Sequence, residues 1–387
     1  MTGSGPGLSR RTLSGRPVLL DARGRKVRDR AVLQRVARLA IPPAWTDVWI
    51  CPHPQGHLQA TGRDAKGRKQ YRYHPDWMSL RNQTKYERLL RFGTALIPLR
   101  KRTETDLALG GLPREKVLAT VVRLLETTLI RIGNPAYVKQ NQSHGLTTMR
   151  DKHVQVVGPK LRFSFKGKSG VAHTIEVEDP RLARIVRRCR DIPGYELFQY
   201  YEEDGTARTV GSGDVNGYLR EIMGEDFTAK DFRTWAGTVE AAALLAAAGP
   251  QETVKDAKAA VVATIQEVAA RLGNRPTTCR KYYVHPAVVE AFLHGGLFPV
   301  LKKVKRRPGL SRNESAVLTL LEKNGGRAPA PDVAALLSAS LKLLKQKARP
   351  GRSPRRAPGR ERRPAPRSSG TGSRPGRSPR PRRSTAA

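Results

Sequence analysis

The sequence predicts an α+β protein with a small β-rich N-terminal domain, a larger and mostly α second domain, and a disordered basic C-terminal tail. In the first part of the chain, short stretches of alternating polar and apolar residues are separated by Gly and Pro turns. From about residue 114, apolar residues recur at the three- and four-residue spacing of helices. Residues 347–387 are almost entirely Arg, Pro, Ser and Gly, a composition that cannot build a hydrophobic core.

These shifts in composition set the expected domain boundaries. The turn formers Gly93 and Pro98 place a linker near 93–101. We therefore expect a disordered N-terminus over 1–15, a β-rich domain over 16–95, a mostly α domain over 96–310, a helical extension over 311–346 and a disordered tail over 347–387.

The N-terminal domain is expected to be a small sheet with two helices. Alternation and turn residues predict a strand, a Gly turn and a strand over 17–27, and further strands over 48–51, 57–61 and 69–74. A short helix over 31–39 ends before Pro42 and Pro43, which cannot continue it. A helix over 76–92 closes the domain.

The second domain is expected to open with a buried helix over 114–130, followed by three strands and then helices. The strands are predicted over 154–157, 161–165 and 173–177, with 165–170 as the turn between the last two. Thr228 or Asp226 is a candidate N-cap for a helix that carries Arg233. Helices are also predicted over 181–191, 215–223, 240–248, 254–272, a short segment ending at 294, a segment from the capping box of Ser311 and Glu314 to 323, and 332–345.

The charge of the chain indicates a polyanionic partner. Lys and Arg number 72 against 33 Asp and Glu, a net charge of +39. The tail carries 14 Lys and Arg against Glu361 alone, a net +13, so +26 remains on the other 346 residues. The folded part is therefore basic in its own right, which points to nucleic acid. A membrane partner is disfavoured because no run of 18 apolar residues occurs and the basic residues are not confined to one amphipathic helix.

The cysteines indicate neither a disulfide framework nor a zinc site. Cys51, Cys189 and Cys279 are odd in number and widely spaced. Cys51 together with His53 and His57 offers three metal ligands around a Pro-rich turn but no fourth. The N-terminus has no apolar signal region, so we expect a cytoplasmic protein.

One stretch, Leu272–Pro286, combines an amide, three basic side chains and the paired phenols Tyr282 and Tyr283. Tyrosine is a weak nucleophile at its free pKa near 10, and it needs neighbouring cations to attack a phosphodiester. Candidate cations are Arg131 after a buried helix, Lys168 on a hairpin tip and Arg233 within a helix. The phenols, Arg131 and Lys168 also have purely structural interpretations: the phenols as ordinary aromatics, Arg131 as a helix cap and Lys168 as a solvated loop residue.

The strand over 69–74 alternates Gln70, Arg72 and His74 with Tyr71 and Tyr73. Aromatic and basic side chains interleaved on a small sheet can contact bases while holding phosphates. The alternative interpretation is that the tyrosines pack the hairpin and the cations are solvated.

Seven short motifs, in order, resemble the type IB DNA topoisomerases, specifically the short poxvirus-like branch found in bacteria. The resemblance covers about residues 16–305. The motifs are Ile41-Pro-Pro-Ala-Trp-Thr-Asp-Val-Trp-Ile50, Gly56-His-Leu-Gln-Ala-Thr-Gly62, Gly67-Arg-Lys-Gln-Tyr-Arg-Tyr-His74, Ile130-Arg-Ile-Gly133, Gly145-Leu-Thr-Thr148, Lys230-Asp-Phe-Arg-Thr-Trp235 and Cys279-Arg-Lys-x-Tyr-Val-His-Pro286.

The resemblance implies a monomer that clamps around duplex DNA and relaxes supercoils through a 3′-phosphotyrosyl intermediate, without ATP and with no essential magnesium. It implies Tyr283 as the nucleophile, Arg131 and Arg233 as clamps on the non-bridging oxygens, and Lys168 as the general acid. Asn274 stands where the poxvirus enzymes have a histidine, and an amide can donate a hydrogen bond but cannot shuttle a proton. By the same resemblance, DNA contacts are expected from Gln70, Tyr71, Tyr73 and Tyr137, and association with the nucleoid is expected.

Two alternatives remain at this point. A tyrosine recombinase shares the chemistry, but such enzymes usually carry a histidine where Lys230 stands, and their N-terminal domain is helical. A non-catalytic DNA-compacting protein would bind through its tail, although all five catalytic positions are filled here. Deletion of 347–387 is expected to lower DNA affinity and its salt dependence and to leave relaxation intact.

Overall fold

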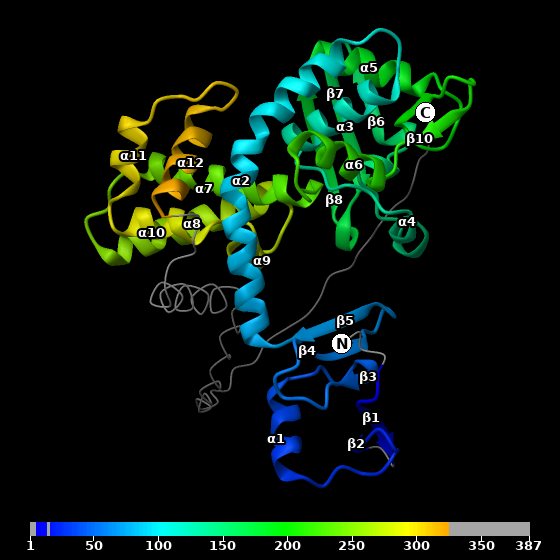
Figure 1. Cartoon of the computed structure of the whole chain (residues 1–387), viewed down its shortest axis with the longest axis vertical. Coiled ribbons are helices and arrows are strands. Elements are labelled where there is room, and N and C mark those ends of the chain that lie inside the picture. The colour runs from blue at the N-terminus through cyan, green and yellow to red at the C-terminus, as the bar shows by residue number, and fades with distance from the viewer. Residues whose placement is uncertain (1–4, 14–15, 325–387) are drawn as a thin grey trace, which may run out of the picture. The chain divides into compact units, whose positions relative to one another are not determined.

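The computed structural model describes residues 5–13 and 16–324 (Figure 1). The helix expected over 332–345 and the tail expected over 347–387 lie outside the described residues. In the part of the chain that is described, no helix has the length and apolar character needed to cross a bilayer.

The N-terminal part of the described chain is a five-stranded antiparallel sheet with one short helix against it. The strands are β1 (Leu8–Leu13), β2 (Arg16–Leu20), β3 (Thr46–Ile50), β4 (Leu58–Arg63) and β5 (Lys69–Tyr73), in the order β2-β1-β3-β4-β5. Helix α1 (Arg30–Arg38) is capped by Asp29, and its Val32 and Val36 pack on a small core that includes Ile50. The β-rich character and most of the predicted strands are confirmed.

The predicted disorder over 1–15 is wrong for residues 8–13, which form β1 between β2 and β3. The Arg-rich composition suggested a solvated segment, yet Arg10 has a local structural role. Its guanidinium donates to the carbonyls of Ile41, Pro42 and Trp45 at 3.2, 2.8 and 2.8 Å. Because these carbonyls lie in a Pro-rich turn outside the sheet, the arginine satisfies acceptors that strand pairing leaves open.

The predicted linker over 93–101 is also wrong, because α2 (Pro75–Ala108) is one continuous helix through Pro98. Proline removes one intrahelical hydrogen bond, at a cost of about 3 kcal/mol in a helix interior. Burial of Leu96 and Leu99 on either side of it offsets that cost. Gly93 permits a close approach, since a Cβ there would lie 2.4 Å from the Trp235 ring.

The second part of the described chain is mostly helical, as predicted, with a three-stranded sheet. Its elements are α3 (Arg114–Thr128), α4 (Pro135–Asn141), the 3-10 turns Leu146–Thr148, Asp151–His153 and Lys168–Gly170, β6 (Val154–Val157), β7 (Lys160–Lys166), β8 (Ala172–Glu178), α5 (Pro180–Arg190), β9 (Gln199–Tyr201), β10 (Ala207–Thr209), α6 (Ser212–Met223), α7 (Ala229–Ala248), α8 (Val254–Arg271), α9 (Pro276–Tyr282), α10 (Pro286–Leu293), α11 (Leu297–Lys303) and α12 (Arg312–Lys323).

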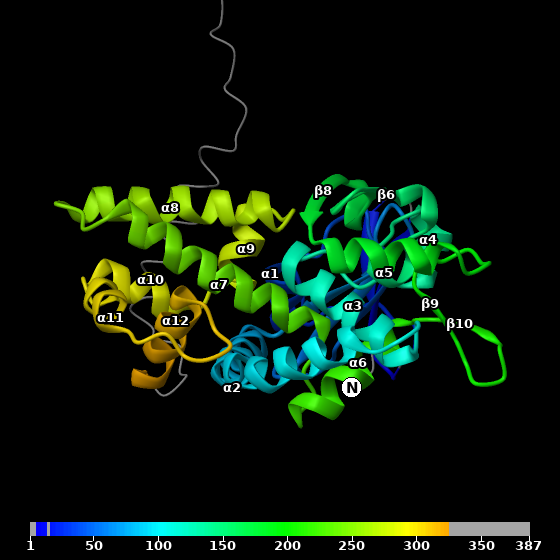
Figure 2. The same cartoon turned by 90° about the horizontal axis from the view of Figure 1, so that it is seen from above.

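The antiparallel sheet β6-β7-β8 contacts α3 and α5, whereas α7 runs beside α8 (Figure 2). A long apolar stripe makes α3 a central helix, with Val117, Leu118, Val121 and Leu125 buried. The sheet and the helices around α7 are therefore joined through α3, which contacts both β8 and α7.

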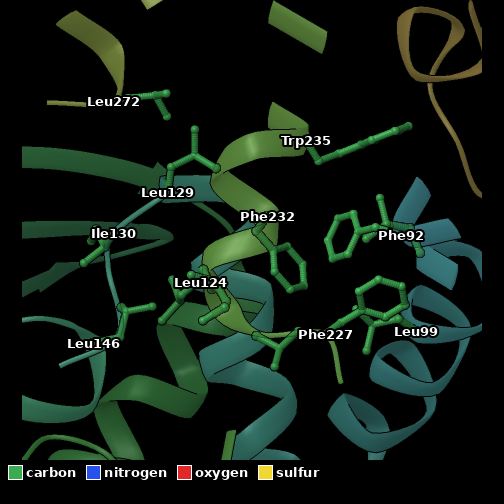
Figure 3. Close-up of a cluster of buried hydrophobic side chains, with 14 of the residues drawn as sticks. Phe92, Leu99, Leu124, Leu129, Ile130, Leu146, Phe227, Phe232, Trp235 and Leu272 are labelled. Atoms are coloured by element: carbon green, nitrogen blue, oxygen red, sulfur yellow. The ribbon is translucent and has the colours of Figure 1, made fainter. Parts of the chain in front are cut away.

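Aromatic residues form the centre of this core (Figure 3). Phe92 of α2 meets Phe227 and Phe232 edge to face, with ring centroids 5.4 and 5.1 Å apart. Such T-shaped pairs add about 0.5–1.5 kcal/mol to the burial of the rings themselves. The packing fixes α2 against the start of α7, the helix that carries Arg233.

A polar network ties α12 to the same helices. Arg100 of α2 bonds Glu314 and Glu126, with closest N–O distances of 2.7 and 2.6 Å, and Trp235 donates to Glu314 at 3.0 Å. Burial raises the pKa of Glu314, but the hydrogen bonds and charge of Arg100 outweigh it and lower that pKa to about 2. Glu314 also completes the predicted capping box with Ser311, which is confirmed.

Candidate active site

The predicted nucleophile Tyr283 is the first residue after the short helix α9, which follows α8 after a four-residue connection. After Leu272 the chain turns at Gly273, whose φ of +57° favours glycine, and Pro276 begins α9 with its fixed φ. The carbonyl of Tyr283 accepts a hydrogen bond of 3.3 Å from the Thr238 hydroxyl of α7. Tyr283 is therefore hydrogen-bonded through its own backbone to α7.

Arg131 reaches Asn274 across the end of α3. The helix ends when Leu129 adopts a left-handed conformation, with φ of 56°, and the chain then extends through Arg131. Nη2 of Arg131 donates to Oδ1 of Asn274 at 2.6 Å. The Nδ2 group of Asn274 is buried and has no hydrogen-bond partner among the described residues. Asn274 thus holds Arg131 with its oxygen and keeps a donor available.

Arg233 is buried in α7 and connects the ends of two other helices. Its two terminal nitrogens donate to the carbonyls of Leu129 and Leu272, which follow α3 and α8. Helix ends leave such carbonyls without intrahelical partners, so the guanidinium satisfies them. Burial and then the charge of Arg131 lower the pKa of Arg233 to about 10, which leaves it protonated at neutral pH.

The ring of Tyr283 lies over this arginine, with 5.6 Å from Cζ of Arg233 to the ring centroid. The Nε group of Arg233 is buried and unpaired within the described part of the chain. A cation therefore lies beside the phenol and retains one N–H for a further acceptor.

Lys168 lines a small cavity of about 20 Å³ together with Arg131 and Arg233. It lies in the turn between β7 and β8, where Ser169 and Gly170 both have positive φ. The cavity is lined by Thr128, Leu129, Ile130, Arg131, His144, Phe165, Gly167, Lys168, His173, Ile175, Arg233, Arg271 and Leu272, and none of these residues is acidic. The positive charge of this lining, with no acidic side chain in it, suits a phosphate.

The predicted five residues thus lie in one region, although they are separated by up to 152 positions in the chain. Arg131, Lys168 and Arg233 line the cavity, Asn274 is bonded to Arg131, and Tyr283 covers Arg233. Among the described residues, no three His, Cys, Asp or Glu side chains form a group that could hold a metal ion. The groups that this region offers to a phosphate are arginine, lysine and amide donors.

Comparison with known proteins identifies the family. A family model described as "Eukaryotic DNA topoisomerase I, catalytic core" matches residues 69–294, and one described as "Bacterial DNA topoisomerase IB, N-terminal domain" matches residues 19–64. The chain belongs to the type IB DNA topoisomerases. It is 30% identical over 267 residues to DNA topoisomerase 1B of Acanthamoeba polyphaga mimivirus, covering 67% of this chain and 80% of the relative.

More distant relatives agree with this assignment. The chain is 23% identical over 287 residues to DNA topoisomerase I of Monkeypox virus and to DNA topoisomerase 1B of Vaccinia virus (strain Copenhagen), in each case covering 70% of this chain and 84% of the relative. As a type IB topoisomerase, the protein is an isomerase that acts on DNA and relaxes supercoils by the type IB mechanism. The recombinase and the non-catalytic alternatives are thereby set aside.

Three residues of the topoisomerase site carried no signal in the sequence. Lys85 of α2 donates to the Tyr282 carbonyl, and its Nζ lies 5.3 Å from the centroid of the Tyr283 ring. Thr238 holds the Tyr283 carbonyl, and His173 lines the cavity. Only the tertiary packing brings them to the site, since each lies in an otherwise ordinary helix or strand.

The predicted DNA contacts on β5 do not share one face of the strand. Tyr71 and Tyr73 stack at 6.0 Å between centroids with Tyr71 47% exposed, whereas Gln70 donates to the Asp64 carboxylate at 2.9 Å. Tyr137 lies on α4 and is 57% exposed. The exposed tyrosines are therefore accessible for DNA, and the amide nitrogen of Gln70 already has a partner.

Proposed function

We propose that Tyr283 is the nucleophile with which this topoisomerase cuts one DNA strand. The observation that carries the proposal is the position of Tyr283 over Arg233, beside a cavity that also presents Arg131 and Lys168 and is lined by no acidic side chain. Tyr282, the neighbouring phenol, is the last residue of α9, and its ring lies 5.4 Å from Nζ of Lys281. Lys281 is not part of the cavity lining, whereas Arg233 beside the Tyr283 ring is, and this favours Tyr283.

In the proposed reaction, Oη of Tyr283 forms a bond to the scissile phosphorus and the bond to the 5′-oxygen breaks. Lys168 gives a proton to the departing 5′-oxygen, and the tyrosyl proton passes to solvent. Arg131 and Arg233 stabilise the extra negative charge of the pentacoordinate transition state through the non-bridging oxygens. Religation is the reverse attack of the 5′-hydroxyl on the phosphotyrosine.

The buried donors without partners support this assignment. Nδ2 of Asn274 and Nε of Arg233 have no acceptor among the described residues. An unsatisfied buried donor costs about 1–3 kcal/mol, and a bound phosphate would remove that cost by accepting from both groups. Asn274 would then stabilise the transition state by hydrogen bonding, without acting as a base.

We also propose that the reaction requires neither ATP nor a metal ion. The phosphotyrosyl ester conserves the energy of the phosphodiester, so resealing needs no external source of energy. Four cationic side chains line the cavity, those of Arg131, Lys168, Arg233 and Arg271, and they would supply the charge stabilisation that a metal would otherwise give. We further propose that a monomer in the cytoplasm acts on nucleoid DNA, with Tyr71, Tyr73, Gln70 and Tyr137 contacting the duplex.

Relaxation of negatively supercoiled plasmid in EDTA without ATP tests the proposal. Wild type and Tyr282→Phe are expected to relax the plasmid and to form a covalent DNA adduct, whereas Tyr283→Phe is expected to do neither while it still binds DNA. Tyr282→Phe is the matched control because it removes a neighbouring hydroxyl of the same type. Adduct formation by Tyr283→Phe would refute the assignment of the nucleophile, and a requirement for Mg²⁺ or ATP would refute the cofactor proposal.

A further inference from the structure

His173 lies inside the candidate site, although the proposed reaction gives it no role. It belongs to β8, pairs across the strands with Phe165, and stacks on that ring with centroids 5.2 Å apart. The half-buried imidazole lines the same cavity as Arg131, Lys168 and Arg233.

Two glycines leave room for this ring. A Cβ on Gly167 would lie 2.6 Å from Cδ2 and 2.8 Å from Nε2 of His173. On the other side, a Cβ on Gly273 would lie 2.7 Å from Cε1. Real Cβ atoms do not approach this closely, so the imidazole is wedged between the hairpin and the turn after α8.

The first of these glycines immediately precedes Lys168. Gly167 is buried and its N–H donates to the Val171 carbonyl at 2.7 Å, which closes the turn, whereas Lys168 itself is exposed. The position of Lys168 therefore depends on what holds Gly167, and the ring of His173 lies nearer than the Phe165 ring to the position that a Cβ on Gly167 would take.

We propose that His173 is a positioning residue of the cleavage reaction, whose imidazole braces Gly167 against Gly273 and so holds Lys168 over the cavity. The inference rests on the proposed role of Lys168 as general acid. Burial, followed by Arg131 and Arg233, lowers the pKa of His173, so the ring is neutral at neutral pH. A neutral spacer keeps the hairpin in place without adding another positive charge beside the lysine.

The test uses single-turnover cleavage of two duplex oligonucleotides that differ in one atom, the bridging 5′-oxygen or a 5′-sulfur at the scissile phosphate. A thiolate leaves without a proton, so a defect in general acid catalysis disappears on the sulfur substrate. Lys168→Ala, which removes the proposed general acid itself, measures how far the sulfur substrate restores the cleavage rate. Thr174→Ala is the matched control, because Thr174 is the next residue of β8 and is exposed.

His173→Ala is expected to cleave the oxygen substrate at least about 10-fold more slowly than wild type and the sulfur substrate within about 3-fold, with DNA affinity changed less than about 2-fold. Thr174→Ala is expected to match wild type on both substrates. An equal defect on the two substrates, or no defect, would overturn the inference. Cleavage by wild type in the same assay tests the proposed reaction separately, and its absence would overturn both.

A second variant tests the contact itself. Gly167→Ala would drive a methyl group into the His173 ring and is expected to show the same oxygen-specific defect. In the His173→Ala background the methyl has room, so the double variant is expected to be no slower than His173→Ala alone. Additive losses in the double variant would contradict a steric link between these two residues.

Discussion

Arg131 and Asn274, 143 residues apart in the chain, are joined by a hydrogen bond of 2.6 Å from Nη2 to Oδ1. The amide can do two things at once: its oxygen orients the arginine, and its buried Nδ2 remains without a partner among the described residues. The effect of a substitution at position 274 therefore depends on two properties of the new side chain: whether it accepts a hydrogen bond from Arg131, and whether it can donate one to a phosphate.

Asn274→Asp is expected to lower the cleavage rate by about 100-fold or more, because it removes a donor and places a negative charge beside an anionic substrate. The carboxylate would also bind Arg131 more tightly than the amide does. Asn274→His, which retains an N–H donor, is expected to stay within about 10-fold of wild type. Single-turnover cleavage at saturating enzyme measures both, and an aspartate variant as fast as wild type would contradict this role for Asn274.

Thr238→Val is expected to slow cleavage by about 10-fold and to lower the free energy of unfolding by about 1–3 kcal/mol. The buried hydroxyl accepts from the His285 backbone N–H at 3.1 Å, and its O–H is shared between the carbonyls of Thr234 at 2.8 Å and Tyr283 at 3.3 Å. Valine removes these hydrogen bonds with little change in shape. Thr238→Ser keeps the hydroxyl and is the control. Equal rates for the valine and serine variants would show that the hydroxyl does not position the nucleophile.

Glu314→Gln is expected to lower the free energy of unfolding by about 2–4 kcal/mol, because it leaves Arg100 partly buried without its full counter-charge. Denaturant unfolding measures the loss. Glu322→Gln, which breaks a more exposed ion pair with Arg307, is the control and is expected to change stability by no more than about 1 kcal/mol. Similar losses in the two variants would contradict a special role for the buried network.

His153 is expected to make the protein less stable as the pH falls from 7 toward 4. Burial, followed by the charges of His144, Lys152 and Arg150, lowers the pKa of His153 to about 4, and its Nδ1 accepts a hydrogen bond from the Arg150 N–H. Below the ordinary histidine pKa near 6.5, the unfolded chain binds a proton that the folded chain does not, so stability is lost as the pH falls through this range.

Thermal melting at pH 7.5, 6.0 and 5.0 measures this effect. His153→Gln has an amide oxygen that can accept from the Arg150 backbone N–H. Its melting temperature is expected to fall less between pH 7.5 and pH 5.0 than that of wild type. His294→Gln removes an exposed histidine and is expected to follow the wild-type curve. If His153→Gln followed it as well, the acid sensitivity would belong to other groups.

Local signals predicted those parts of the fold that depend on nearby residues. The capping box of Ser311 and Glu314, the buried stripe of α3 and the hairpin that carries Lys168 are all present, because each is specified within a few residues. The predicted disorder of 8–13 and the break near Pro98 were wrong because distant groups decided them: carbonyls of a Pro-rich turn in the first case, and packing around Leu96 and Leu99 in the second.

The same distinction applies to the site. The motifs predict Arg131, Lys168, Arg233, Asn274 and Tyr283 as the catalytic residues, and in the structure these residues lie close together. It could not be predicted that Arg233 joins the ends of α3 and α8, or that His173 lies between two glycines, since these relations exist only after the chain has packed. Residues that position a reacting group through tertiary contacts alone do not form a recognisable motif in the sequence.

Thr238, which holds the Tyr283 carbonyl, and Arg233, which lies under the Tyr283 ring, are little more than one turn apart on α7. A DNA end attached to Tyr283 would thus be held against the same helix that carries Arg233, one of the charges proposed to stabilise resealing. The other DNA end could then rotate under torque while Tyr283, Thr238 and Arg233 keep their positions. The number of turns released per nick would then depend on how quickly the DNA rotates and on how long the nick lasts.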